Sequence, residues 1–105
     1  VAEYTKNRAL GICDLCHNPA PFKKKNGEAY LEEHHVITLA DGGPDAIYNT
    51  VALCPNCHKK VHVLNHKDDV FNLKRTIFNY LKNDNDEKNL KFFNNLFTEY
   101  QKINN

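Results

Sequence analysis

Methionine and tryptophan are absent from the sequence, and its longest unbroken apolar run is only four residues, Val51–Cys54. A helix that crosses a bilayer needs about 20 apolar residues, so the sequence predicts no transmembrane segment. The N-terminus also lacks the charged region, apolar stretch and cleavage site of a secretory signal, which favours an intracellular, cytoplasmic protein. Because position 1 is not methionine, we expect the chain to be part of a longer protein.

An excess of either charge is missing as well. The sequence has 14 Lys and Arg residues against 13 Asp and Glu residues, a net charge of +1. No basic field therefore marks the whole chain as a nucleic-acid binder, although balanced charge does not exclude one. The hydrophobic fraction of 41% and the charged fraction of 26% are ordinary for a globular protein and exclude disorder throughout. A length of 105 residues suits a single domain.

The four cysteines form two Cys-x-x-Cys pairs, Cys13 with Cys16 and Cys54 with Cys57. Each such turn directs two thiolates toward one point, and two turns together complete the tetrahedral site of a structural Zn²⁺. Disulfides, in any of three connectivities, and a redox role are the alternatives, which a reducing compartment disfavours. Residues 17–53 separate the pairs, more than the spacing of about 15 to 20 residues usual for such sites, so a substantial insertion divides the zinc clip.

Two short strands and a helix are expected in and just after this insertion. Aromatic and branched residues predict one strand over 30–37 and a second over Thr50–Leu53, with turn-forming residues at 41–45 between them. Pro55 is well placed as the first residue of the helix that follows. Ahead of the first cysteine, residues 2–10 predict a short helix that a glycine ends.

The last third of the sequence predicts two helices. Asp68 and Asp69 open the first, and the Asn- and Asp-rich residues 83–86 separate it from the second. Apolar residues three and four apart form one stripe on each helix, namely Val70, Leu73, Ile77 and Leu81, then Leu90, Phe93, Phe97 and Tyr100. Such stripes are typical of core faces, so we expect a helical extension over 67–105 to pack on residues 1–66, within the same domain.

Histidine is concentrated in the insertion and in the helix after it. His58 and His62 are four residues apart, which puts both imidazoles on one helix face as a ready metal chelate. His34 and His35 lie in the first predicted strand and supply a third corner. Since consecutive strand residues face opposite sides, both can reach one cleft only if the strand bulges or ends there, and we expect such a distortion.

The strings LEEHHV, ADGG and LCPNCHKKVH, together with Asn49, resemble the HNH endonuclease family, whose fold is a ββα-metal finger. The chain looks most like the four-cysteine zinc HNH domains of McrA-type restriction endonucleases, which are often modification-dependent. The resemblance implies a small α+β fold, a ββα-metal domain with a zinc clip and a C-terminal helical extension. By position, His35 matches the general base, Asn49 the residue that orients it, and His34, His58 and His62 the ligands of the catalytic metal.

The resemblance also implies an activity, hydrolysis of DNA phosphodiester bonds by a metal-dependent endonuclease. The metal would stabilise charge on the leaving 3′ oxygen while His35 takes a proton from water. Its cofactors would be a structural Zn²⁺ and one catalytic divalent ion, Mg, Mn, Ni, Co or Zn. DNA is the expected partner, a specificity domain is expected elsewhere in a bacterial or phage-like protein, and a homodimer is left open. The alternative is a zinc-stabilised module that binds nucleic acid or protein without catalysis.

Charged residues near these motifs are accessory candidates. Glu32 is either a carboxylate behind the metal ligands or a solvated charge, since it shares a strand face with the first histidine. Lys59, Lys60 and Arg8 are candidates for phosphate contacts. Residues 23–25 form a further short run of lysines, which is either a solvated surface or functional.

Overall fold

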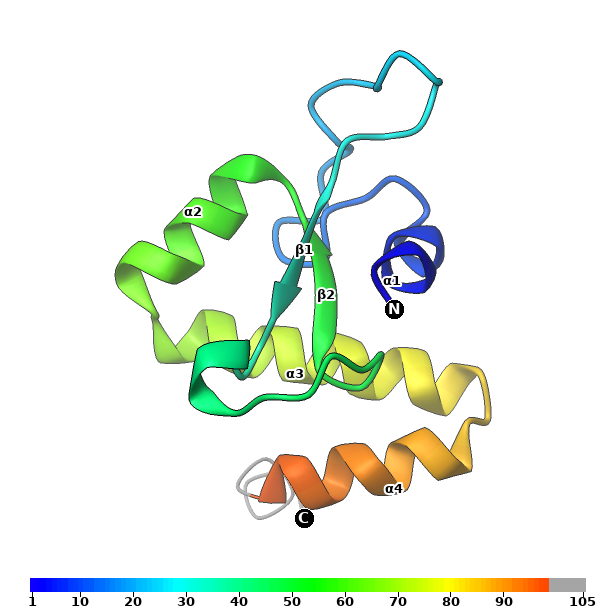
Figure 1. Cartoon of the computed structure of the whole chain (residues 1–105), viewed down its shortest axis with the longest axis vertical. Coiled ribbons are helices and arrows are strands. Elements are labelled where there is room, and N and C mark those ends of the chain that lie inside the picture. The colour runs from blue at the N-terminus through cyan, green and yellow to red at the C-terminus, as the bar shows by residue number, and fades with distance from the viewer. Residues whose placement is uncertain (99–105) are drawn as a thin grey trace.

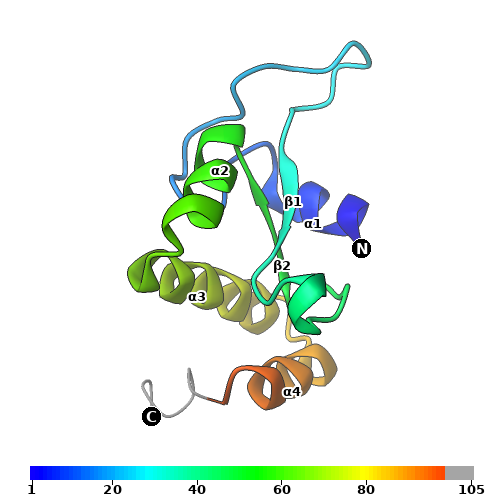
Figure 2. The same ribbon diagram turned by 60° about the vertical axis from the view of Figure 1, so that its left-hand side comes forward.

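Two short strands lie at the centre of the structure, which is a computed structural model that describes residues 1–98. The elements are α1 (Ala2–Ala9), β1 (Glu32–His35), η1 (Leu39–Asp41), β2 (Thr50–Leu53), α2 (Pro55–Leu64), α3 (Lys67–Asn83) and α4 (Glu87–Leu96). Helices α1 and α2 flank the strands, and α3 and α4 pack side by side at one end (Figure 1, Figure 2). The predicted α+β fold, a ββα unit with a C-terminal helical extension, is confirmed.

The strands pair antiparallel, with Glu32 opposite Leu53 and His35 opposite Thr50. Strand β2 has the predicted bounds, whereas β1 is shorter than the predicted 30–37. The Val36 amide still bonds to the carbonyl of Asn49 at 2.8 Å, in register with the strands, and the ladder ends there because the Asn49 amide donates to the carbonyl of Ala46 at 2.9 Å. The expected distortion at the paired histidines is therefore the end of the strand.

Helix α2 begins as its sequence predicts. Cys54 is the N-cap, its Sγ accepts from the amide of Cys57 at 3.5 Å, and Pro55 occupies the first turn, where its missing N–H is not needed. Helix α1 ends at Ala9, one residue before the predicted end, because Leu10 already adopts a left-handed conformation with φ of 54°. The start of α2 and the end of α1 are thus set by local signals.

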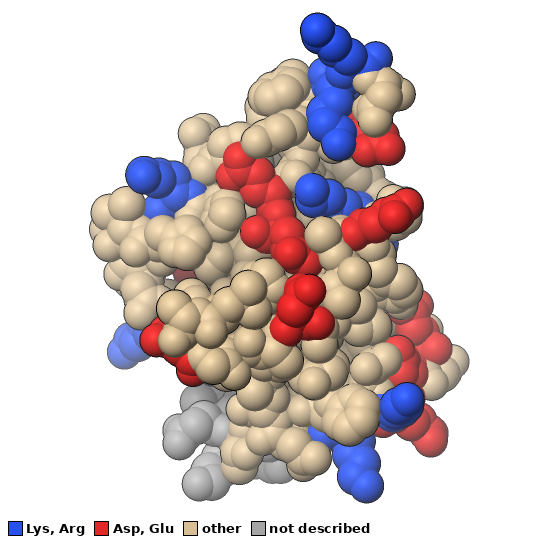
Figure 3. All heavy atoms as spheres, viewed as in Figure 1, with Lys and Arg blue, Asp and Glu red and all other residues tan. Residues whose placement is uncertain are grey.

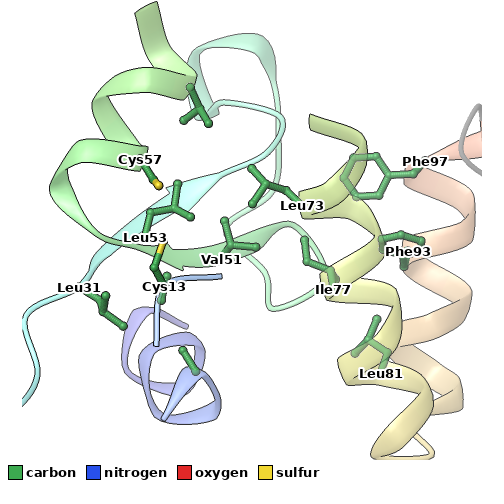
Figure 4. Close-up of a cluster of buried hydrophobic side chains, with 13 residues drawn as sticks. Cys13, Leu31, Val51, Leu53, Cys57, Leu73, Ile77, Leu81, Phe93 and Phe97 are labelled. Atoms are coloured by element: carbon green, nitrogen blue, oxygen red, sulfur yellow. The ribbon is translucent and has the colours of Figure 1, made fainter. Parts of the chain in front are cut away.

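One apolar cluster joins the strands to the C-terminal helices (Figure 4). Its buried members come from three elements. They include Val51 and Leu53 of β2, Leu73, Ile77 and Leu81 of α3, Phe93 of α4 and Phe97, which directly follows α4. Each such side chain stabilises the fold by about 1.5–3 kcal/mol relative to an exposed position. Both predicted stripes are therefore core faces, although Tyr100 lies outside the described residues. Within residues 1–98, no helix has the length and apolarity of a membrane span.

A buried polar network fastens α3 to the first cysteine turn. Asp14 accepts hydrogen bonds from the amide of Ala52 at 2.8 Å and the hydroxyl of Tyr80 at 2.6 Å, and burial still raises the pKa of this carboxyl. The Arg8 guanidinium lies 4.5 Å from the Tyr80 ring centre and donates to the Thr50 carbonyl at 2.7 Å. Arg8 is thus engaged inside the fold and does not lie free for phosphate contacts.

An exposed hairpin precedes β1 and projects from the top of the molecule in Figures 1 and 2. The Tyr30 amide donates to the Phe22 carbonyl at 2.9 Å, and the two rings stack with centroids 4.6 Å apart. Nearer the tip, the Lys24 amide donates to the Glu28 carbonyl at 2.7 Å. These contacts make the hairpin an ordered excursion that carries the run of lysines at 23–25 into solvent.

Candidate metal and catalytic centre

The four cysteines converge although residues 17–53 separate the two pairs. Their sulfur atoms all lie within 4.8 Å of one another. A zinc ion bound to four thiolates at about 2.3 Å would hold the sulfurs about 3.8 Å apart, so the cluster fits a tetrahedral zinc clip. The side chains of Cys13 and Cys57 point toward one another beside Leu53 (Figure 4).

The surroundings of the cysteines favour a bound cation. Burial raises the pKa of both Cys13 and Cys57, so paired thiolates at this place are costly unless a metal ion compensates their charge. The amide of Leu15 donates to the sulfur of Cys13 at 3.4 Å, and the amide of Cys57 donates to that of Cys54. Backbone donors of this kind stabilise negative sulfur, which fits the structural zinc that the sequence predicts.

Three histidines form a second cluster, on the side of β1 that faces α2. His34 comes from β1, and His58 and His62 come from successive turns of α2. Their ligand nitrogens lie within 4.8 Å of one another, and the Nε2 atoms of His58 and His62 are 3.1 Å apart. Two imidazoles on one ion at about 2.1 Å have nitrogens about 3.4 Å apart, so the cluster fits a divalent metal with an open position.

Glu32 supports this cluster from behind. Its Oε1 lies 2.9 Å from Nδ1 of His58, and its Oε2 accepts from the hydroxyl of Tyr30 at 2.7 Å. Because an ionised carboxylate only accepts, Nδ1 of His58 carries the proton and Nε2 presents its lone pair to a metal. The hydrogen bonds from Tyr30 and His58 lower the pKa of Glu32, which keeps the carboxylate ionised. Of the two alternatives for Glu32, the structure favours the carboxylate behind the ligands.

His34 is the buried member of the cluster. It is 8% exposed, and burial, followed by the neighbouring histidines, lowers its pKa to about 4. A neutral imidazole is the form that binds a metal, so His34 is ready to coordinate near neutral pH. His62, by contrast, is exposed at the rim of the cluster.

His35 borders the same pocket as the three histidines but has different partners. The pocket has a volume of about 200 Å³ and is lined by Glu33, His34, His35, Thr38, Leu39, His58 and His62. Nε2 of His35 lies 2.9 Å from Oδ1 of Asp45, which is part of the loop between the strands. The end of β1 at His35 thus lets consecutive histidines line one pocket while only His34 joins the metal cluster.

The sequence analysis expects a hydrogen bond from Asn49 to His35, but the Asn49 side chain bonds to other groups. Its side chain accepts from the amide of Ile37 and donates to the carbonyls of Ile37 and Pro44, each at 2.9 Å. Both N–H groups of the buried amide are used in these bonds, so none is left for the imidazole. The expected direct hydrogen bond to His35 is therefore absent, and Asn49 instead braces the loop that follows β1.

The two accessory lysines lie on the exposed side of α2. Lys60 pairs with Asp69 of α3 at 3.3 Å, and Lys59 is exposed next to His58. Neither lines the pocket that holds the histidines. The side chain of Lys60 is 49% exposed and that of Asp69 is 14% exposed. Both ammonium groups therefore reach solvent, but that of Lys60 already has a carboxylate partner.

Sequence reasoning missed two residues that the structure brings to the centre. Tyr30 lies two positions before Glu32, the spacing that puts strand residues on one side, and this signal was available in the sequence. Asp45 lies in the turn-forming segment, where nothing in the sequence marks it as a partner of His35, because its position depends on the path of the whole loop. Its contact comes from tertiary structure alone.

Three comparisons place the chain among known proteins. A match to the HNH endonuclease family spans residues 13–64. The chain is 48% identical over 62 residues to the type IV methyl-directed restriction enzyme EcoKMcrA of Escherichia coli strain K12, which covers 59% of this chain and 22% of that protein. It is 34% identical over 65 residues to anaredoxin of a Nostoc species, which covers 51% of this chain and 86% of that protein.

Among solved structures, the chain is similar to the type IV phosphorothioation-dependent restriction endonuclease ScoMcrA. The TM-score is 0.58 and the sequence identity 34%, over 70% of this chain and 14% of that chain. The chain therefore spans less than a quarter of either restriction enzyme. The matched residues include both cysteine pairs and all the histidines of the pocket. The chain belongs to the HNH endonuclease family.

Proposed function

We propose that this chain is the cleavage module of a restriction-type enzyme and hydrolyses DNA phosphodiester bonds with the help of a divalent metal ion. The observation that carries the proposal is one pocket lined by a three-histidine cluster and, beside it, by His35, which belongs to no part of that cluster. Metal ligands next to a separate general base are the two kinds of group that metal-assisted hydrolysis requires.

In this proposal, His34, His58 and His62 hold the catalytic ion, which can be Mg, Mn, Ni, Co or Zn, and the cysteines hold a structural Zn²⁺. When bound, the ion supplies positive charge at the scissile phosphate and the leaving 3′ oxygen. His35 accepts a proton from a water molecule, whose oxygen forms a bond to phosphorus as the bond to the 3′ oxygen breaks. Glu32 keeps His58 in the tautomer that can serve as a ligand.

The charges around the pocket bear on how DNA approaches. Acidic side chains run down the centre of the face seen in Figure 3, and basic side chains gather at its top, where Figure 1 shows the hairpin. Strand β1, which contributes to the pocket, carries Glu32 and Glu33. Carboxylates beside the pocket repel a phosphate unless a divalent ion offsets them. We propose that the lysines at 23–25 make phosphate contacts. With a net charge of +1, the chain alone binds DNA weakly and depends on salt.

Specificity is proposed to come from another part of a longer protein. EcoKMcrA is described as methyl-directed and ScoMcrA as phosphorothioation-dependent, and this chain spans a small share of each. We propose that any requirement for modified DNA is set outside this chain, since the lining of the histidine pocket includes no Phe, Tyr or Trp on which a flipped base could stack.

Cleavage of supercoiled plasmid tests the proposal. The purified chain, freed of its weakly held metal and supplied with Mg, Mn, Ni, Co or Zn, should nick plasmid with at least one ion. His35→Ala should lower the rate by about 10²- to 10⁴-fold, because general-base catalysis is lost. His66→Asn, a matched control, replaces an exposed histidine that caps α3 and should cleave like the wild type.

Two results would contradict the proposal. Cleavage by His35→Ala at the wild-type rate would remove the base from the mechanism. A folded wild-type chain that retains zinc and binds DNA, yet cuts no plasmid with any ion, would favour the alternative of a binding module without catalysis.

A further inference from the structure

The contact between His35 and Asp45 fixes which nitrogen of the imidazole carries a proton. Nε2 of His35 and Oδ1 of Asp45 are 2.9 Å apart, a good hydrogen-bond distance. Because an ionised carboxylate has no proton to donate, Nε2 must carry the hydrogen. Nδ1 is then the nitrogen with a free lone pair, and it is the atom available to accept a proton from water.

The side chain of Asp45 is 59% exposed, so packing does not fix its position. The backbone before it does. The preceding residue, Pro44, accepts a hydrogen bond from the buried amide of Asn49 at 2.9 Å. One residue earlier, Gly43 packs so closely that an added Cβ would lie 1.8 Å from the carbonyl oxygen of Ile37. Its amide also donates to Thr38 at 2.9 Å. The loop therefore has one course, and that course brings Asp45 to His35.

We propose that Asp45 is a positioning residue for His35: it holds the imidazole with Nε2 protonated, so that Nδ1 serves as the proton acceptor in the pocket. This inference rests on the proposed nuclease function and extends it. It also gives Asn49 a route to His35, because the Asn49 amide fixes Pro44, the residue before Asp45. The negative charge of Asp45 also favours the imidazolium that forms when the base accepts a proton, less strongly than the buried carboxylate of a hydrolase triad because the Asp45 side chain is exposed.

Glu33 is the other carboxylate near this base, and it does not fill the same role. Its Oε1 lies 3.8 Å from Nε2 of His35, too far for a hydrogen bond, and its Oε2 is buried without a hydrogen-bond partner. Glu33 adds negative potential at the imidazole, but it does not select the protonated nitrogen. The competing explanation is that Asp45 and His35 form an ordinary surface ion pair, which would contribute little to stability and would not affect the cleavage rate.

The test compares Asp45→Ala with Asp45→Glu, whose longer side chain still brings a carboxylate to the imidazole. The matched control is Asp41→Ala, which removes an exposed aspartate of the same loop that bonds to Thr38 and not to a histidine. In single-turnover plasmid cleavage, Asp45→Ala should lower the rate constant about 10- to 100-fold without changing the Kd for DNA, by analogy with carboxylates that orient histidine ligands. Asp45→Glu should recover most of the loss, and Asp41→Ala should match the wild type.

A second readout does not depend on cleavage. The ¹⁵N NMR shifts of His35 should report a single tautomer, with Nε2 protonated, in the wild type and in Asp41→Ala, and a mixture of tautomers in Asp45→Ala. Unchanged nitrogen shifts together with a wild-type rate constant in Asp45→Ala would overturn the inference. If the wild type itself cuts no DNA, the proposed function fails, while the nitrogen shifts still decide whether Asp45 positions His35.

Discussion

The cysteine cluster and the histidine cluster share helix α2 but differ in the number and kind of ligands they offer. Each has a buried and an exposed side: Cys13 is 0% exposed while Cys16 is exposed, and His34 is 8% exposed while His62 is exposed. Four protein ligands leave no place for a reactant, and three ligands leave one. The comparison teaches that a complete set of protein ligands suits a structural ion, whereas an incomplete set beside a pocket suits an ion that meets a substrate.

The two clusters are also physically joined. Cys57 and His58 are adjacent, so whatever fixes the cysteine also fixes the backbone from which the metal-binding imidazole extends. The supporting groups differ in kind: backbone amides donate to the sulfurs, while the carboxylate of Glu32 accepts from His58. Amide donors stabilise anionic ligands, and a carboxylate orients a neutral one. Under the proposed function, a structural zinc ion would therefore act on catalysis only through the position of His58.

Cys54→Ser should have the largest effect and would test the structural half of the comparison. Serine is a good N-cap, so the substitution retains the start of α2 and removes chiefly a zinc ligand. The free energy of unfolding should fall by about 3 kcal/mol or more, because zinc binding in such sites contributes to folding directly. Urea unfolding followed by circular dichroism measures it, with the exposed Asn56→Ser as the control on the same turn. A wild-type unfolding midpoint for Cys54→Ser would mean that the cysteines are not a structural zinc clip.

Glu32→Gln should have a smaller effect, on metal binding at the histidine cluster and not on the stability of the fold. The affinity for the catalytic ion should fall about 10- to 100-fold, because the carboxylate that orients His58 is lost. Stability should change by no more than about 0.5 kcal/mol, as for most partly exposed positions. Cleavage measured against metal concentration gives the affinity, and Glu28→Gln in the hairpin is the control. Equal metal dependence in Glu32→Gln and the wild type would leave Glu32 without a role at the site.

The features that the sequence predicts well are those with short-range spacing. The Cys-x-x-Cys pairs, the four-residue spacing of His58 and His62, and the apolar stripe that includes Leu73 and Ile77 all express periodicities of a turn or a helix. The bounds of β2 and the start of α2 follow for the same reason, because Pro55 and the cysteine before it act locally. The resemblance to HNH endonucleases then supplies roles that spacing alone cannot.

The features that the sequence does not predict depend on the path of the chain in three dimensions. The family pattern marks Asn49 as the orienting residue, but its partners, the backbone at 37 and 44, are fixed only by how the loop folds back. The contact of Asp45 with His35 and the burial of Arg8 beneath Tyr80 join residues far apart in sequence or in a loop without regular spacing. Such contacts leave no periodic signal.

The central claim, that one metal ion holds the fold and another serves the pocket, is tested most directly by removing the metals in two steps. Native mass spectrometry should count the ions per chain, while circular dichroism and plasmid cleavage are followed on the same samples. The account predicts that a mild chelator removes the ion at the histidines and abolishes cleavage with the fold intact, and that only a stronger chelator removes zinc and unfolds the chain. Loss of the fold together with the first ion, or cleavage that persists after that ion has left, would contradict it.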